Sequence, residues 1–270
     1  MKQNSYFLLT AAVTLLVACS GPKNLSTGGH SDPALRLSQQ NVNAALYQNA
    51  SAEVAWMQEQ AFAHARLKLD INLLDSLNMP PAVIVDVDET MLDNSPYELE
   101  NLAAGRSYTP ETWKGWTARA SAKPIPGALA FVHYAVSRGC EIYYVTNRDH
   151  DEKGATIINL AALGFPMADS IHVMTMQGTS DKTPRQKMVE RQHSVVLLIG
   201  DQLTDYRQVL KDRSTEHGLP AMYAMDKELE RYFILLPNST YGYWRDGITG
   251  KGTDAEKLQR VKGFIEERTK

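Results

Sequence analysis

The chain has 270 residues, which is enough for one large domain with a cap or for two small domains. Its 28 Lys and Arg residues against 31 Asp and Glu residues give a formal net charge of -3. This balance is too mild to indicate binding to nucleic acid or to a membrane surface by charge, so we expect no nucleic-acid partner.

The N-terminus is predicted to be an export signal. Residues 6–17 are apolar, follow a weakly basic start and are too few to span a membrane comfortably. Residues 16–19 resemble the bacterial lipoprotein signal, so we expect cleavage after residue 18 and lipidation of Cys19; the alternative is an ordinary secretory peptide. The residue after this cysteine is Ser20 rather than Asp, which resembles the sorting signal of outer-membrane lipoproteins. We therefore expect an outer-membrane lipoprotein that faces the periplasm or the cell surface.

A flexible segment and then a helical segment are expected before the first strand. Residues 19–33 are rich in Gly, Ser and Asn and are predicted to be a flexible tether. Residues 34–78 have apolar side chains at helical spacing and no internal Gly or Pro, which predicts two or more helices that contribute to a cap. With Cys19 lipidated, Cys140 has no partner and is expected to be a buried, inert thiol.

Residues 79–250 are predicted to form an α/β core. The predicted strands are residues 82–87, 141–146, 171–174, 194–199 and 232–236, and the helices between them are residues 126–139, 151–163, 182–192 and 205–211. Strands that alternate with helices predict a doubly wound parallel sheet with helices on both faces. The aromatic-rich residues 94–123 are expected to form a smaller helical cap domain over the strand ends, and residues 251–270 a C-terminal helix.

Three predicted strands end in polar side chains. Because the carboxyl ends of parallel strands meet at one edge of a sheet, we expect these groups to lie close together. Close carboxylates can bind a divalent cation, or act as nucleophile and general acid. For the first pair alone, a solvated loop or a helix cap is the alternative. The residues are Asp86 and Asp88 after the first strand, Thr146, Asn147 and Arg148 at the second, and Asp201 and Asp205 after the fourth.

These motifs resemble those of a known family. The twelve residues Asp86–Tyr97 are similar to the first motif of the bacterial class C acid phosphatases, lipoprotein members of the haloacid dehalogenase superfamily that include 5'-nucleotidases. Residues 145–148, 181–185 and 200–205 resemble the second, lysine and fourth motifs, and the likeness runs from about Gln39 to about Trp244. In the fourth motif, Gln202 and Tyr206 stand where the family usually has Asn and Phe.

The carboxylates are expected to divide the chemistry among them. Asp86 is the expected nucleophile, which would form a phospho-aspartyl intermediate, and Asp88 is the expected proton donor. A cation must bridge two anions, and Mg²⁺ suits carboxylate oxygens, with Asp86 and Asp201 as ligands. The resemblance implies that Asp88 adds its backbone carbonyl. Asp205 is expected to ligate through water or to orient Lys182, with a helix N-cap as the alternative.

Other side chains are expected to hold the phosphate and the leaving group. The resemblance implies that Thr146 and Lys182 bind the phosphate, and Asn147 either joins them or frames the loop. The resemblance also implies that Trp113 and Tyr241 sandwich a nucleobase or another flat group. Tyr97 is expected as a further substrate contact, although packing within the cap is the alternative for all three. Arg148 is expected to frame the same loop, with pairing to a core acid as the alternative. The other side chains expected to support the loops or to compete with Lys182 are Glu89, Asp93, Arg185 and Lys187.

The sequence therefore predicts an exported, Mg²⁺-dependent phosphomonoesterase that acts on nucleoside monophosphates and aryl phosphates. A phosphotransferase that uses an alcohol acceptor is an open alternative, whereas a non-catalytic binding lipoprotein is disfavoured because all four aspartates are present. The expected partners are small phosphate monoesters, the membrane only through a lipid anchor, and, as an open option, a second copy of the chain.

Overall fold

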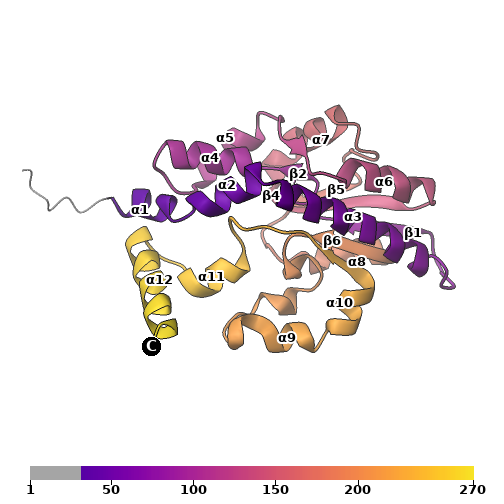
Figure 1. Ribbon diagram of the computed structural model, residues 1–270. Coiled ribbons are helices and arrows are strands. Elements are labelled where there is room, and N and C mark those ends of the chain that lie inside the picture. Colours follow the sequence, from indigo (N-terminus) through magenta and orange to yellow (C-terminus); the bar gives the residue numbers. More distant parts are fainter. Residues whose placement is uncertain (1–31) are drawn as a thin grey trace, which may run out of the picture. The chain divides into compact units, whose positions relative to one another are not determined.

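The computed structural model describes residues 32–270, which form one compact unit. The predicted signal peptide, Cys19 and most of the tether lie outside the described residues. A five-stranded sheet with the order β5-β4-β1-β6-β7 lies at the centre, and all neighbouring strands are parallel (Figure 1). The strands are β1 (Pro81–Val85), β4 (Glu141–Asp149), β5 (Val173–Met176), β6 (Ser194–Gly200) and β7 (Phe233–Leu235). The predicted parallel α/β fold is confirmed.

Helices cover both faces of this sheet, which explains why β1 is a continuous apolar run. Val83 and Val85 face one buried cluster, and Ala82 and Ile84 face the other. A strand covered on both faces has no polar side, so its sequence cannot alternate. The first cluster lies under α3 (Ala52–Asn72), α6 (Ala128–Ser137) and α7 (Lys153–Ala162), and the second under α8 (Thr183–Glu190) and α10 (Asp226–Tyr232).

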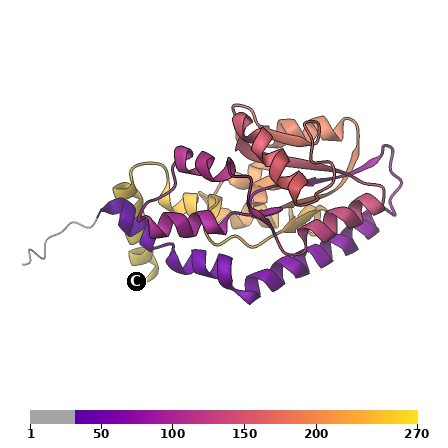
Figure 2. The same ribbon diagram turned by 90° about the horizontal axis from the view of Figure 1, so that it is seen from above.

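Helix α3 differs from the prediction, which placed all of residues 34–78 in the cap. It lies on the sheet beside α6 instead (Figure 2), and Phe62 packs on Phe131 of α6 with ring centroids 5.7 Å apart. The Asn72 amide also donates to the Val196 carbonyl of β6, at 2.8 Å. The helical spacing identifies the buried stripe, but a stripe does not say which surface it covers. The two shorter helices, α1 (Pro33–Gln39) and α2 (Val42–Ala50), pack against the cap as predicted.

Residues 205–211, predicted as one helix, form two short 3₁₀ turns, Leu203–Asp205 and Gln208–Lys211. The Asp205 carbonyl, which a continuing helix would use, accepts instead from the Gln186 side-chain amide at 2.7 Å. Strand β5 begins two residues later than predicted because the Asp169 carboxylate accepts the amides of the two residues before it. In both places a side chain hydrogen-bonds a backbone carbonyl or amide that a helix or a strand would otherwise use.

The cap insertion expected at about residues 94–123 corresponds to α4 (Ser95–Ala103) and α5 (Pro110–Thr117), flanked by a short antiparallel pair, β2 (Leu92–Asp93) and β3 (Lys123–Pro124). Trp116 joins its two ends, because its indole N–H donates to Asn94 at 2.8 Å. The chain finishes with α9 (Leu219–Tyr223), α11 (Tyr243–Thr249) and α12 (Asp254–Arg268), the last of which was predicted.

Cys140 is a free, buried thiol, as predicted. Burial raises its pKa to about 11, so the reactive thiolate is scarce at neutral pH. Within residues 32–270, no helix combines the length and the apolar character that a membrane span requires.

The packing of α3 on the sheet can be tested with two leucines of the same helix. Leu69 is fully buried, whereas Leu67 is 65% exposed. We expect Leu69→Ala to lower the free energy of unfolding by about 2–5 kcal/mol, since it leaves a cavity, and Leu67→Ala to change it by no more than about 0.5 kcal/mol. Urea unfolding followed by circular dichroism measures both. Equal effects would mean that α3 does not lie on the sheet.

Candidate active site

The polar ends of β1, β4 and β6 meet at one edge of the sheet, as expected. β1 lies between the other two strands, so Asp86 lies between the end of β4 and Asp201. The Asp86 amide donates to the Ile199 carbonyl of β6 at 2.9 Å, which extends the strand pairing by one hydrogen bond beyond β1. The position of the Asp86 side chain is therefore set by the sheet itself.

A tight loop after Asp86 brings the next acidic residues together. The Val87 carbonyl accepts the amides of Met91 and Leu92, each at 2.8 Å, and Glu89 has a left-handed backbone with φ of 54°. Such a conformation is strained for a residue with a side chain and persists only where its surroundings fix it. The Glu89 carboxylate fixes it by accepting the Asn94 amide at 2.9 Å.

The loop roles expected for Glu89 and Asp93 agree with their contacts. Besides the Asn94 amide, the Glu89 carboxylate accepts a short hydrogen bond from the Tyr241 hydroxyl. Asp93 accepts the Ser95 amide at 2.9 Å, at the start of α4. Glu89 thereby ties the first loop to the segment that follows β7, a contact that the sequence did not indicate.

Three buried carboxylates, those of Asp86, Asp201 and Asp205, can each offer an oxygen such that all three oxygens lie within 4.8 Å of one another. Burial raises the pKa of Asp86 well above its ordinary value, although Lys182 opposes this and the neighbouring aspartates add to it. Burial and the charge of Asp205 raise the pKa of Asp201 to about 6. This excess of negative charge and the all-oxygen donor set fit a hard divalent cation.

Lys182 lies among these carboxylates. Its ammonium nitrogen is 2.5 Å from Asp86 Oδ1 and 2.7 Å from Asp205 Oδ1. Burial lowers the pKa of Lys182, but the two carboxylates outweigh that effect and raise it, so the lysine is charged. The second Asp205 oxygen accepts the Gln202 amide at 2.9 Å. Asp205 therefore contacts Lys182, as one prediction had it, and also accepts the N-cap amide of its own turn, Leu203–Asp205.

Asp88 is held by the guanidinium of Arg148. Its Oδ1 accepts from Arg148 Nη2 at 2.8 Å and Nε at 3.0 Å, and from Asn94 at 2.8 Å. Its Oδ2 has only longer contacts, 3.3 Å to Arg148 and 3.4 Å to the Thr146 hydroxyl. Of the two roles considered for Arg148, pairing with a core acid is the observed one, and Oδ2 is the less engaged Asp88 oxygen.

The backbone carbonyl of Asp88, the other expected metal ligand, accepts no hydrogen bond from residues 32–270. The flanking carbonyl of Val87 takes the bonds that close the loop instead. The Asp88 carbonyl is therefore available as a neutral oxygen ligand beside the three carboxylates.

The loop after β4 is supported from below by Arg185. This residue donates to the Asn147 side-chain carbonyl at 2.7 Å and also to the Thr146 backbone carbonyl. Asn147 is left with amide N–H groups at the cavity, whereas Thr146 is buried and its hydroxyl accepts the Arg148 amide at 3.1 Å. Arg185 thus frames the loop, and the other rival of Lys182, Lys187, is exposed on α8.

Sequence reasoning missed Asn238, just after β7. Its amide donates to Asp201 Oδ2 at 2.7 Å, next to a 2.8 Å bond from Gln202, and its carbonyl accepts the Thr240 amide at 2.9 Å. Asn238 therefore holds Asp201 and shapes the segment that carries Tyr241. The signal that could have found it was its place after a strand that ends at the same edge of the sheet.

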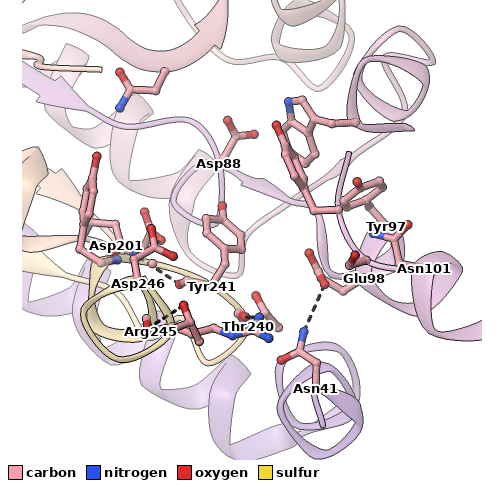
Figure 3. A pocket seen from close by; sticks show the side chains of 18 of the residues that line it. Asn41, Asp88, Tyr97, Glu98, Asn101, Asp201, Thr240, Tyr241, Arg245 and Asp246 are labelled. Atoms are coloured by element: carbon pink, nitrogen blue, oxygen red, sulfur yellow. Dashed lines mark hydrogen bonds between the residues drawn. The ribbon is translucent and has the colours of Figure 1, made fainter. Parts of the chain in front are cut away.

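A cavity of about 500 Å³ opens over these groups (Figure 3). The three aromatic residues expected to contact substrate, Tyr97, Trp113 and Tyr241, all line it. Tyr97 is almost completely buried and meets Trp113 edge-on, with ring centroids 5.2 Å apart, so these two rings also form the packed interior of the cap. The cavity size suits a small organic ester rather than a macromolecule.

The sequence family described as haloacid dehalogenase superfamily, subfamily IIIB (acid phosphatase), matches residues 29–244. The chain belongs to this acid phosphatase family. The class C acid phosphatase from Bacillus anthracis is 31% identical, with a TM-score of 0.80 over 84% of this chain and 97% of that one. A second structure of that enzyme, with tungstate bound, matches equally well. The resemblance to class C acid phosphatases is confirmed.

Plant proteins are also similar to this chain. The stem 28 kDa glycoprotein of Glycine max is 25% identical over 169 residues, which cover 60% of this chain and 64% of that protein. Acid phosphatase 1 of Solanum lycopersicum is 27% identical over 131 residues, or 45% of this chain and 50% of that protein. The chain thus spans less than two thirds of the length of these curated relatives.

The fit of Asp205 against β6 can be tested at Gly200. A Cβ atom there would lie 2.3 Å from Asp205 Oδ2, so Asp205 would have to leave Lys182 and the Gln202 amide. We expect Gly200→Ala to lower phosphatase kcat/KM about 100-fold, as misplacement of a reacting group does.

The control is Gly154 on α7, where an added Cβ would meet nothing within 4 Å. Gly154→Ala should keep its activity and be as stable as the parent protein or slightly more so. Steady-state rates and urea midpoints measure both variants. Full activity in Gly200→Ala would show that the position of Asp205 is not needed.

Proposed function

We propose that this acid phosphatase hydrolyses nucleoside monophosphates and aryl phosphates with Mg²⁺ as cofactor, through a phospho-aspartyl intermediate. The single observation that carries the proposal is the Asp86 carboxylate, which is buried at the floor of the cavity and paired with Lys182 at 2.5 Å. Phosphoryl transfer needs a positioned nucleophile and positive charge around the phosphate, and both are present at this point.

In the first step, an Asp86 oxygen attacks phosphorus and the bond from phosphorus to the leaving alcohol breaks. Asp88 gives a proton to the leaving oxygen, and its less engaged Oδ2 is the oxygen suited to this. Asp88 then takes a proton from water, which attacks the aspartyl phosphate, releases inorganic phosphate and restores Asp86. The two transfers balance, because the proton lost to the alcohol is regained from water.

The phosphate oxygens would be held by donors at the cavity floor. Lys182 supplies a charge, and Asn147 supplies amide N–H groups because Arg185 holds its carbonyl. Thr146, the third expected donor, is fully buried and does not line the cavity, so its hydroxyl would need a small displacement from its 3.4 Å contact with Asp88 to reach a phosphate oxygen. Tungstate, bound in the similar enzyme, is a tetrahedral oxyanion like phosphate, which supports an oxyanion site in this fold.

Asp86, Asp201 and the Asp88 carbonyl are the groups that would hold Mg²⁺, and Asp205 would keep Lys182 in place. When bound, the cation offsets the repulsion between the Asp86 carboxylate and the substrate phosphate. The requirement follows from charge, since Lys182 alone cannot neutralise the three carboxylates around it.

We further propose that the protein is exported and anchored by lipid at Cys19, in the outer membrane. The support for this is the sequence of residues 6–20 alone. Dephosphorylation outside the cytoplasm would release an uncharged nucleoside that a cell can take up.

Asp86→Asn tests the nucleophile. Asn is nearly isosteric but a poor nucleophile, so we expect kcat to fall by at least about 1,000-fold with the fold retained. The matched control is Asp93→Asn in the same loop, because Asp93 bonds the Ser95 amide and does not line the cavity. It should stay within a few-fold of the parent. Activity above a few percent in Asp86→Asn would exclude the covalent route.

Thermal unfolding tests the cation site without any substrate. A ligand that binds only the folded state raises the melting temperature, so Mg²⁺ added after EDTA treatment should stabilise the parent protein. Asp201→Asn should need more Mg²⁺ for the same shift, since it loses one charged ligand.

Asp151→Asn is the control, because Asp149, Asp151 and Glu152 form a second acidic group, in which Asp151 is the exposed member. It should respond to Mg²⁺ like the parent protein. If Asp151→Asn lost the thermal shift and Asp201→Asn kept it, the cation would bind at the surface and the assigned site would be wrong.

A further inference from the structure

The cavity continues past the catalytic carboxylates to an outer polar group, which we define as Asn41, Glu98, Asn101 and Arg245. Asn41 lies between α1 and α2, Glu98 and Asn101 lie on α4, and Arg245 lies on α11. Figure 3 shows these side chains around the end of the cavity away from Asp88. A phosphate fills only the inner end, so this group faces the alcohol that leaves.

Glu98 presents a carboxylate oxygen without a partner. Its Oε2 accepts from the Asn41 amide at 3.2 Å (dashed in Figure 3), whereas no group of residues 32–270 donates to Oε1. Burial raises the pKa of Glu98, although Arg245 and the Asn41 bond oppose this. A carboxylate at this depth loses much of its hydration, so a hydrogen-bond donor from a bound molecule would stabilise it.

Asn101 supplies a second unsatisfied group three residues further along the same face of α4. It is 3% exposed, and its carbonyl accepts from Arg106 at 2.9 Å. Its amide nitrogen has no partner among the described residues. This nitrogen is enclosed, so it adds an unsatisfied donor beside the cavity wall, and the open acceptor that a ligand can reach is the Glu98 carboxylate.

The outer polar group therefore offers both acceptors and donors. Arg245 bonds the Thr240 carbonyl through one nitrogen, at 3.2 Å, and has further N–H groups. A hydroxyl is the ligand group that both donates and accepts, and two adjacent hydroxyls would satisfy Glu98 and a neighbouring donor together. The positive charge of Arg245 near Glu98 disfavours an ammonium group as the alternative occupant.

Resting on the function proposed above, we propose that the outer polar group binds hydroxyls of the leaving group, with Glu98 as the residue that determines this specificity. The preferred substrates are then phosphate esters of sugar-bearing alcohols, whose hydroxyls reach Glu98 while the phosphate lies at Asp86. Aryl phosphates would be hydrolysed without using this end of the cavity.

The test compares kcat/KM for a ribonucleoside 5'-monophosphate and its 2',3'-dideoxy counterpart, with an aryl phosphate as a third substrate. The parent protein should prefer the ribonucleotide by about tenfold or more, since a site built to bond a hydroxyl rejects the analogue that lacks it. In Glu98→Gln and Glu98→Ala this ratio should fall about tenfold, towards one. The ratio divides out any general loss of activity.

Glu100→Gln is the matched control. Glu100 is on the same helix but pairs with Arg119 at 2.6 Å and does not line the cavity. Its variant should keep the parent ratio. Use of both Glu98 variants guards against one that fails to fold, and the aryl phosphate rate identifies such a case.

Equal parent rates on the ribo and dideoxy esters, or an unchanged ratio in folded Glu98 variants, would overturn this inference alone. So would a preference for 2-aminoethyl phosphate over ethyl phosphate that disappears in the Glu98 variants, because Glu98 would then bind a cation. No hydrolysis of any ester by the parent protein would overturn the proposed function, and this inference with it.

Discussion

Mutual repulsion among buried carboxylates is the constraint around which this protein is built. Asp86, Asp201 and Asp205 lie close together at the ends of β1 and β6, where the surrounding protein screens charge far less than water does. Lys182 neutralises part of this charge by contacting Asp86 and Asp205 together. The remaining excess of negative charge and the all-oxygen donor set suit a divalent cation.

The neighbouring structure serves to hold these charges in place. Asp88 and Asp201 do not contact Lys182. Arg148 holds Asp88 instead, and Asn238 holds Asp201. Gly200 allows Asp205 to approach β6 more closely than any residue with a Cβ would permit. Because these side chains are already held in place, a phosphate could bind beside the carboxylates without a large rearrangement of the protein.

The two ends of the cavity have different origins in the chain. The inner end comes from strand ends, whose backbone is fixed by the sheet. The outer end comes from helical segments α1–α2, α4 and α11, which are far apart in sequence and outside the sheet. In the function proposed above, the reacting groups therefore lie on backbone that the sheet fixes, whereas the groups that would select the leaving group lie on helical segments outside the sheet.

The sequence by itself determined the strands and the inner site. Buried parallel strands are continuous apolar runs, and the residues that follow them must meet at one edge, so Asp86, Asp201 and Lys182 could be placed from local patterns and motif order. The type of each element depends on interactions between residues that are close in sequence. The position of the reacting groups depends on the sheet, whose edge they follow.

Only the tertiary structure decided which surface each helix covers and which side chains close the site. The apolar stripe of α3 fits a cap or a sheet equally well, and residues 205–211 lost their helix to a hydrogen bond from α8. Asn238 and Glu98 meet the cavity through contacts between distant segments, and no local pattern marks such residues. Periodicity records that a side chain is buried, whereas its partner depends on how the whole chain packs.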